Sequence, residues 1–161
     1  MGGHSTSPLD SGGTVSAMSA ATNKTLVLDY YQRVVADGAF RDIPKYIADS
    51  YIDHNAPPGS GTGPTLVEAH LRVIRHTFPD FTLKMHEVIA EGDWVAVRVT
   101  GEGTHLGEWL GIKPSGRRIQ LRGLNLDRVV NGRIVEHWGE ADTVGMLLQM
   151  GVDPFKSVAA V

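Results

Sequence analysis

The feature that most constrains the fold is a pair of alternating polar and apolar stretches joined by Asn131-Gly132. Asn-Gly is the strongest short signal for a tight turn between two antiparallel strands. Residues 117–130 and 133–141 are therefore predicted to form a hairpin. An isolated hairpin is unstable in water, so other parts of the chain must cover one of its faces.

A second strand pair is predicted before this hairpin. Residues 81–90 and 94–103 alternate in the same way and flank a Glu-Gly-Asp turn. Residues 106–113 predict a less regular strand, because Gly107 and Gly111 interrupt the pattern and suggest bulges. An antiparallel sheet therefore accounts for most of the second half of the chain.

Helical spacing occurs ahead of the sheet. Apolar residues recur every three or four positions at Val27, Tyr30, Tyr31, Val34 and Val35. The helix that they predict is capped by Thr22 or Asn23 and ends at Asp37-Gly38. A short second helix begins after Asp42, which can cap it, and residues 51–55 are predicted to be extended.

A third helix is predicted to start around Pro64 and to stop before Pro79. Thr65 and Glu68 have the spacing of a capping box at its start. Its apolar residues recur at the spacing of one helix face. A last helical turn is predicted over about residues 143–150.

These elements predict the α+β class, with about three N-terminal helices packed on a strongly curved antiparallel sheet. A twisted sheet that curls around helices leaves a cone, whose open end is a natural ligand pocket. One domain is expected over residues 23–155. Residues 1–22, rich in Gly, Ser, Thr and Ala, predict a flexible leader, and residues 156–161 predict a C-terminal tail.

Composition excludes several classes of function. The 161 residues carry a net charge of −3 and no basic cluster that could follow a phosphate backbone, so no nucleic-acid partner is expected. The absence of cysteine excludes disulfides, thiolate nucleophiles and Cys-ligated metal sites. We find no apolar run long enough to span a membrane and no signal peptide, so a cytoplasmic protein without a membrane partner is expected.

No motif indicates a metal or an organic cofactor. The seven histidines include no His-Glu-x-x-His pair. The chain also lacks the glycine-rich loops of nucleotide-binding proteins and the Gly-x-Ser-x-Gly turn of serine hydrolases. Nucleotide cofactors and a serine hydrolase mechanism are therefore not expected, and metal binding has weak support.

The last hairpin carries the strongest candidates for catalysis. Because side chains alternate along a strand, Asn125 and Asp127 share one face, and we expect His137 to join them in the pocket. His137 is the best general acid–base candidate, since its ordinary pKa lies near neutrality. Asn125 could donate a hydrogen bond to a developing enolate oxygen. Leu124 and Leu126 would then face outward, toward a subunit interface. A one-residue slip in register would instead make His137 a surface or interface histidine.

A second candidate group is Asp53-His54-Asn55, just before the Pro-Pro-Gly loop. A polar triplet that closes a strand can line the entrance of a cavity, and Asp53 or His54 could serve there as a base. The alternative is a purely structural role, because Asp and Asn often bond neighbouring backbone amides in loops.

Three further positions carry candidate side chains. His105 and Trp109 flank a glycine at which the backbone can approach a ligand, and Trp109 could stack on a flat substrate. The alternative is a bulged strand with a core tryptophan. Arg98 is an odd polar residue in an apolar strand, and it could anchor a carboxylate or form an ion pair with Asp142 or Glu136.

Five segments stand in a distinctive order and spacing. They are Asp53-His54-Asn55-Ala56-Pro57, Phe78-Pro79-Asp80-Phe81, Gly92-Asp93-Trp94-Val95-Ala96-Val97-Arg98, Gly103-Thr104-His105-Leu106-Gly107 and Gly132-Arg133-Ile134-Val135-Glu136-His137-Trp138, with Asp142 beyond. Over roughly residues 24–151 the chain resembles the SnoaL-like polyketide cyclases. The resemblance implies the cone-shaped fold of nuclear transport factor 2 and ketosteroid isomerase. It also implies homodimers or homotetramers, and chemistry without metal or cofactor.

The resemblance also implies a reaction. In these cyclases an intramolecular aldol condensation closes the last ring of an aromatic polyketide, by deprotonating a carbon next to a carbonyl and stabilising the enolate. By analogy with ketosteroid isomerase, Tyr31 would match the tyrosine of the oxyanion hole, Asn125 the position of its partner acid, and Asn55 would lie near the base. The acid–base pair of the cyclases, a His and an Asp on the final two strands, falls here on Asn125 and Gly139. Neither residue can transfer a proton at neutral pH.

The sequence therefore predicts a cofactor-independent cyclase-like enzyme of secondary metabolism that acts on a flat, apolar polyketide-type substrate. His137, His54 or His105 would transfer protons, and Asn125, Asn55 and Tyr31 would orient carbonyl oxygens. Further substrate contacts are expected from Arg98, Trp109, Asp127 and Asp142. Relatives that act as hydroxylases with a separate reductase, or that open epoxides, support a second interpretation. A non-catalytic protein that binds a small ligand is a third.

Overall fold

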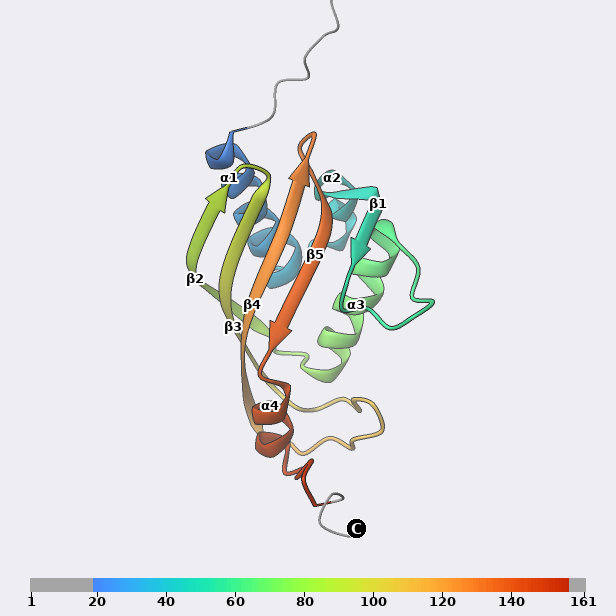
Figure 1. The fold of residues 1–161 in the computed structure, drawn as a ribbon. Coiled ribbons are helices and arrows are strands. Elements are labelled where there is room, and N and C mark those ends of the chain that lie inside the picture. The colour runs from blue at the N-terminus through green and yellow to red at the C-terminus, as the bar shows by residue number, and fades with distance from the viewer. Residues whose placement is uncertain (1–18, 157–161) are drawn as a thin grey trace, which may run out of the picture.

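The computed structural model describes residues 19–156, and within them five strands form one curved sheet (Figure 1). The spatial order is β1-β5-β4-β3-β2. The strands are β1 (Ile47–Asp53), β2 (Thr82–Glu91), β3 (Trp94–Thr104), β4 (Arg118–Val130) and β5 (Arg133–Ala141). The four C-terminal strands pair antiparallel, as their alternation predicts. The α+β class and the curved sheet covered by helices are thus confirmed.

The edge strand β1 differs from the expectation, because it pairs parallel to β5 in an otherwise antiparallel sheet. Ile47 pairs with Ile134, and Asp53 pairs with His137. A parallel partner reaches the sheet by a crossover from another element, so no local turn signal announces it. This pairing places the end of β1 directly beside the strand that carries His137.

Helices cover one face of the sheet, and Figure 1 shows α1, α2 and α3 together on that side. The helices are α1 (Ala20–Tyr30), continued by the π-helical segment Tyr31–Ala36, then α2 (Ile43–Tyr46), α3 (Gly63–Thr77) and α4 (Thr143–Met150). A short 3₁₀ segment, Phe40–Asp42, precedes α2.

Both predicted N-caps of the longer helices lie too far along the chain. Ser19 caps α1 by accepting the Thr22 backbone N–H at 3.2 Å, so the helix starts before the expected Thr22 or Asn23. Thr62, rather than Thr65, stands at the N-cap of α3. The predicted leader boundary at residue 22 therefore falls inside α1. The remainder of that leader, residues 1–18, and residues 157–161 of the tail lie outside the described residues.

The segment between β3 and β4 is a loop rather than the predicted irregular strand. Its isolated bridge joins Trp109 to Ile112. The loop is bound to the end of α3, because the Thr77 carbonyl accepts the N–H groups of Leu106 at 3.0 Å and Gly107 at 3.1 Å. A Cβ at Gly107 would lie 2.1 Å from the His76 carbonyl oxygen, so a side chain there is excluded by the neighbouring backbone. Gly107 thus marks a close approach and not a bulge in a strand.

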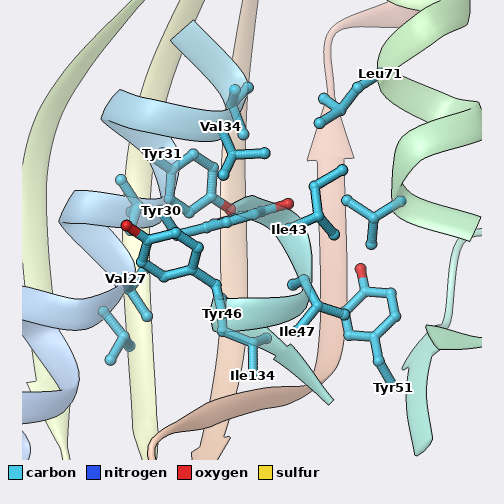
Figure 2. Close-up of a cluster of buried hydrophobic side chains, with 14 of the residues drawn as sticks. Val27, Tyr30, Tyr31, Val34, Ile43, Tyr46, Ile47, Tyr51, Leu71 and Ile134 are labelled. Atoms are coloured by element: carbon cyan, nitrogen blue, oxygen red, sulfur yellow. The ribbon is translucent and has the colours of Figure 1, made fainter. Parts of the chain in front are cut away.

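The main core lies between the sheet and the first helices. Figure 2 shows Tyr30, Tyr31 and Tyr46 gathered beside α1, with Tyr51 farther over, on the side of α3. The Tyr30 ring centroid lies 5.3 Å from that of Tyr31 and 5.9 Å from that of Tyr46. Apolar side chains that pack around them are Val27, Val34, Ile43, Ile47 and Ile134. The core therefore contains several hydroxyl groups, which must find partners or a cavity.

Candidate functional site

A cavity of about 540 Å³ lies between α3, the inner face of the sheet and the loop 105–117. This volume lies within the usual range for sites that bind small molecules. Its walls are mostly apolar, with side chains such as Val67, Leu71, Ile74, Phe78 and Leu121. A group of polar residues lies at the end of β1, in the middle of β4 and β5, and on α1 and α3. The cavity therefore combines an apolar body with one polar region.

Glycines on the inner face of the sheet leave room for neighbouring side chains in the cavity wall. Gly101, Gly123 and Gly139 lie on three neighbouring strands, and all three line the cavity. Inward positions in a strand normally carry side chains, and a Cβ at Gly101 would lie 2.8 Å from the Phe81 ring. The missing side chain at Gly101 therefore makes room for the Phe81 ring, which also lines the cavity.

The polar end contains a chain of hydrogen bonds that ends at His137. The Tyr31 hydroxyl donates to Asp127 Oδ2 at 3.0 Å. The other carboxylate oxygen, Oδ1, lies 2.8 Å from His137 Nδ1. A carboxylate can only accept, so Nδ1–H donates and the Nε2 side of the ring is available for proton transfer. Asp127 is 1% exposed and lies behind His137, so it holds the ring rather than lining the cavity.

The surroundings of His137 favour its charged form. Burial acts to lower the pKa of the ring, but the hydrogen bond to Asp127 and the charges of Asp127 and Asp53 outweigh it. The pKa of His137 is therefore raised above its ordinary value of 6.5. A raised pKa favours the protonated ring, which can donate its proton to a substrate oxygen.

Two rows of polar residues cross the inner face at this end. In the first, Asp53 of β1 pairs with His137 of β5, which pairs with Asp127 of β4. In the second, Asn125 pairs with Gly139, and Asn55 Oδ1 accepts the Gly139 backbone N–H at 2.7 Å. A register shift between Arg128 and Val129 brings Asp127 opposite His137, so Asn125, Asp127 and His137 share the inner face, as predicted.

Gly139 explains where the His137 ring lies. A Cβ at this position would lie 2.8 Å from His137 Nε2 and 3.2 Å from Asn125 Oδ1. The imidazole therefore occupies space that a side chain at position 139 would need. The resemblance to cyclases places an acidic residue of the acid–base pair at this position, and here the ring of His137 takes that space instead.

Sequence reasoning missed several residues of the polar region. Tyr30, Tyr51 and His70 line the cavity, as does Asp53, which the sequence already indicated as a candidate base. Burial, followed by the charges of nearby acidic groups, raises the pKa of Tyr30 above its ordinary value. Burial also raises the pKa of Tyr51, so both hydroxyls stay protonated. For His70 a signal existed, because a lone histidine interrupts the apolar face of α3.

The structure places His54 away from the cavity, which corrects its candidacy as a catalytic residue. Its ring stacks on Trp138 with centroids 3.9 Å apart, and Nε2 lies 3.0 Å from Glu136 Oε2. The reason is strand alternation: Asp53 faces inward, so its neighbour His54 faces the outer side of the sheet. Asn55, the next residue, lines the cavity as expected.

Of the loop candidates, Trp109 lines the cavity and His105 does not. His105 is fully buried, and its Nδ1 accepts the Ser115 backbone N–H at 3.2 Å. Its Nε2 has no hydrogen-bond partner within the described residues. His105 thus holds the base of the loop, which corrects its expected role in proton transfer, because it is packed inside the loop.

Arg98 and Asp142 are also placed outside the cavity, which corrects their expected substrate contacts. Arg98 faces the outer side of β3 and pairs with Glu87, with Nη2 3.0 Å from Glu87 Oε1. It does not reach Asp142 or Glu136. Asp142 caps α4 by accepting the Gly145 N–H at 2.9 Å and receives Arg122 Nη2 at 2.8 Å. Both residues therefore have structural partners.

Tyr31 lines the cavity, but its hydroxyl is committed to Asp127. This differs from the expected oxyanion-hole role, which needs a free donor.

Within residues 19–156, no group of three or more His, Asp or Glu side chains is arranged to hold a metal ion. None of the helices in this range is long and apolar enough to cross a membrane.

Residues 25–150 match the model of the SnoaL-like polyketide cyclases. The chain belongs to this family. It is 31% identical over 121 residues to nogalonic acid methyl ester cyclase of Streptomyces nogalater, covering 73% of this chain and 89% of that protein. It is also 31% identical to an aklanonic acid methyl ester cyclase of Streptomyces galilaeus, covering 71% of this chain and 81% of the relative.

Solved structures of SnoaL-like proteins share the fold. IdmH of Streptomyces antibioticus, a proposed polyketide cyclase, superposes with a TM-score of 0.70 at 32% identity, covering 81% of this chain and 99% of IdmH. AclR of Streptomyces galilaeus, a proposed hydroxylase, gives a TM-score of 0.64 at 27% identity, covering 83% of this chain and 98% of AclR. The predicted family and the prediction of a cyclase-like enzyme are confirmed.

Proposed function

We propose that this SnoaL-like protein closes a ring of a polyketide-type substrate by acid–base catalysis in the cavity beside His137. The names of its relatives support the substrate class, since they act on methyl esters of aklanonic and nogalonic acid. The cavity of about 540 Å³ has apolar walls suited to a flat, fused-ring molecule and one polar end suited to its oxygens.

The observation that carries this proposal is the geometry of His137. Asp127 holds Nδ1 at 2.8 Å, so the ring has one orientation and Nε2 lies beside Asn125 and Gly139 at the cavity wall. A protonated His137 can hydrogen bond a carbonyl oxygen and pass it the proton as the new carbon–carbon bond forms. The ketone oxygen then becomes a hydroxyl.

Asn125 and Asn55 are proposed to orient substrate oxygens. Both line the cavity. Asn55 Oδ1 already accepts the Gly139 N–H, which leaves its amide nitrogen as the donor. Amide donors cannot take up a proton at neutral pH, but they stabilise an enolate oxygen once it forms. They thus complement His137 and do not replace it.

Aklanonic acid methyl ester and nogalonic acid methyl ester are the probes for this proposal. We expect the protein to convert at least one of them to its ring-closed isomer, without oxygen or any added cofactor, as detected by chromatography and absorbance. His137→Gln is expected to lower kcat by about 100-fold or more, because a positioned acid contributes about 10²–10⁴ in rate.

His76→Gln is the matched control, since His76 is an exposed histidine on α3 that does not line the cavity. Unchanged turnover in His137→Gln would overturn the role of His137. Binding of both probes without any product, with and without oxygen and a reductase, would instead identify a ligand-binding protein.

A hydroxylase-type reaction is the second candidate. The similarity to AclR and the presence of Asn125 and Gly139 at the positions of the cyclase acid–base pair favour it. A product that contains one additional oxygen atom, and that forms only with oxygen and a reductant, would establish this function in place of ring closure.

We also propose that the protein is a homodimer joined through the outer face of the sheet. Trp94, Leu124, Leu126 and Trp138 line a shallow groove there, and Leu124 is 54% exposed. Glu140 also lines the groove, and the nearby Arg128 and Glu136 pair with each other, with Arg128 Nη1 2.7 Å from Glu136 Oε1. A largely apolar face suits a second copy of the same face.

A further inference from the structure

His70 is a titratable residue of the cavity that the mechanism above does not use. It lies on the face of α3 that turns toward the cavity, where its helical neighbours are Val67, Leu71 and Ile74. Within the described residues neither ring nitrogen has a hydrogen-bond partner. A polar ring on an otherwise apolar face, open to the cavity and without a structural partner, is available to a ligand.

His70 and His137 stand on opposite walls of the same polar region. His70 is on a helix, whereas His137 is on the sheet, and the charges of Asp53 and His137 both act on His70. Asp53 is the register partner of His137, so it borders both rings. A carbonyl compound bound in the cavity would therefore have one imidazole on each side.

The two rings differ in their electrostatic surroundings. Burial among protein atoms lowers the pKa of His70 below its ordinary value, and the charge of His137 acts in the same direction against the opposing charge of Asp53. The pKa of His137 is raised, because Asp127 outweighs the effect of burial. Two groups whose environments push their pKa values apart are suited to separate acid and base roles.

Other ionisable groups that line the cavity are less suited to the role of base. The hydroxyls of Tyr30, Tyr31 and Tyr51 remain protonated, because burial raises the pKa of each one. Asp53 Oδ1 accepts the Asn55 backbone N–H at 2.9 Å. Of the two glutamates in the lining, Glu102 accepts hydrogen bonds from Arg118 and Gln120, and Glu140 also lines the outer groove.

We propose that His70 is the general base that removes a proton from the substrate carbon, while His137 protonates the carbonyl oxygen on the opposite side. This inference rests on the proposed ring closure. The C–H bond breaks and its proton moves to a ring nitrogen of His70. The resulting enolate carbon forms a bond to the ketone carbon, whose oxygen takes the proton of His137. Water then carries the proton from His70 to solvent. A second proton passes from solvent to His137, so both rings regain their starting states.

Deuterium exchange at the reacting carbon tests His70 as the base. In D₂O, with aklanonic acid methyl ester as the probe, the wild-type protein is expected to incorporate deuterium at this carbon and to close the ring. His70→Gln is expected to lower both rates by about 100-fold or more, with the dissociation constant of the probe changed less than threefold. His76→Gln, on the same helix, is expected to match the wild type in both rates.

Two further measurements guard against unfolding. Melting curves by circular dichroism are measured for the wild type, His70→Gln and a second variant, His70→Asn. They show whether a loss of rate follows from a loss of fold. The pH dependence of kcat in the wild type needs no variant: a base with a lowered pKa and an acid with a raised pKa give a bell-shaped profile. Its rising limb belongs to His70 and its falling limb to His137.

The outcomes distinguish this inference from the proposed function. If the wild type closes the ring and His70→Gln keeps both rates within threefold, the role of His70 is wrong while the proposed function stands. If the wild type neither exchanges the proton nor closes the ring of either methyl ester, both are overturned.

Discussion

At the scale of single residues, the identity of a side chain matters less than the group that holds it. Two of the candidate histidines illustrate this: His137 is oriented by Asp127 at the cavity, whereas His105 is bound by Ser115 inside a loop. Their ordinary pKa is the same, so chemistry depends on access and on the partner. Asp127 thus acts through His137 as a positioning residue.

Asp127→Asn tests this positioning role. Replacing the carboxylate by an amide removes the negative charge and weakens the hydrogen bond that raise the pKa of His137, so the pKa is expected to fall. The falling limb of the kcat–pH profile then moves to lower pH. NMR titration of the His137 ring would check the shift directly, and an unchanged pKa would contradict it.

Tyr31→Phe is the matched variant, because it removes the hydrogen bond to Asp127 and leaves the charge in place. The raised pKa of His137 should persist in this variant.

The sign of the effect of pH on stability follows from linkage. A histidine whose pKa is raised in the folded state contributes its full stabilisation at pH values below its unfolded-state pKa of about 6.5. This stabilisation is lost as the pH rises through the folded-state pKa. Asp127→Asn should weaken this pH dependence.

At the scale of elements, the loop 105–117 is positioned by its contact with the end of α3. The Thr77 carbonyl binds two of its N–H groups, and Gly107 lies against the His76 backbone. The loop carries Trp109 and Leu110 to the cavity. Leu110 is 83% exposed, which is costly for a leucine unless a ligand or a partner covers it. The loop thus supplies apolar surface at the mouth of the site.

Gly107→Ala tests this attachment. The added Cβ would lie 2.1 Å from a backbone oxygen, so the loop must move away from α3. Overpacking of this kind typically costs about 1–3 kcal/mol. We expect lower stability in urea unfolding and weaker binding of aklanonic acid methyl ester. The neighbouring Glu108→Ala should match the wild type, because Glu108 is exposed. Equal stability of the two variants would refute the contact.

At the scale of the whole molecule, the two faces of the sheet have different tasks. The inner face lines the cavity, and the outer face presents apolar side chains to solvent. Trp94 and Leu126 are each 37% exposed. A contiguous apolar groove on an exposed sheet face is typical of an interaction site. The proposed homodimer would cover it and leave each cavity complete within its own chain.

The double variant Leu124→Lys, Leu126→Lys tests the proposed dimer. Charged residues at the centre of a self-complementary interface would face their own copies across the axis, so a monomer is expected in sedimentation equilibrium. Leu148→Lys is the control, since Leu148 is an exposed leucine on α4 at 50% exposure. A dimer that survives the double variant would disprove this interface.

The amino-acid sequence by itself determined the antiparallel strands, the helices that cover them and the turn of the last hairpin. Alternation with a period of two and the Asn131-Gly132 turn are local signals, and they account for the pairing of Val130 with Arg133. The register shift between Arg128 and Val129, which places Asp127 opposite His137 rather than Glu136, belongs to the folded sheet. The ordered motifs also sufficed to indicate the SnoaL-like family.

Only the tertiary structure decided which candidates meet. The parallel pairing of β1 with β5 turned Asp53 toward His137 and His54 away from it. The packing of α3 against the sheet brought His70 opposite His137. These contacts join residues far apart in the chain through a crossover and a helix face. The spacing on α3 puts His70 on the apolar face of its helix, but no local signal places it beside His137. The acid–base environment is therefore a property of the packed molecule.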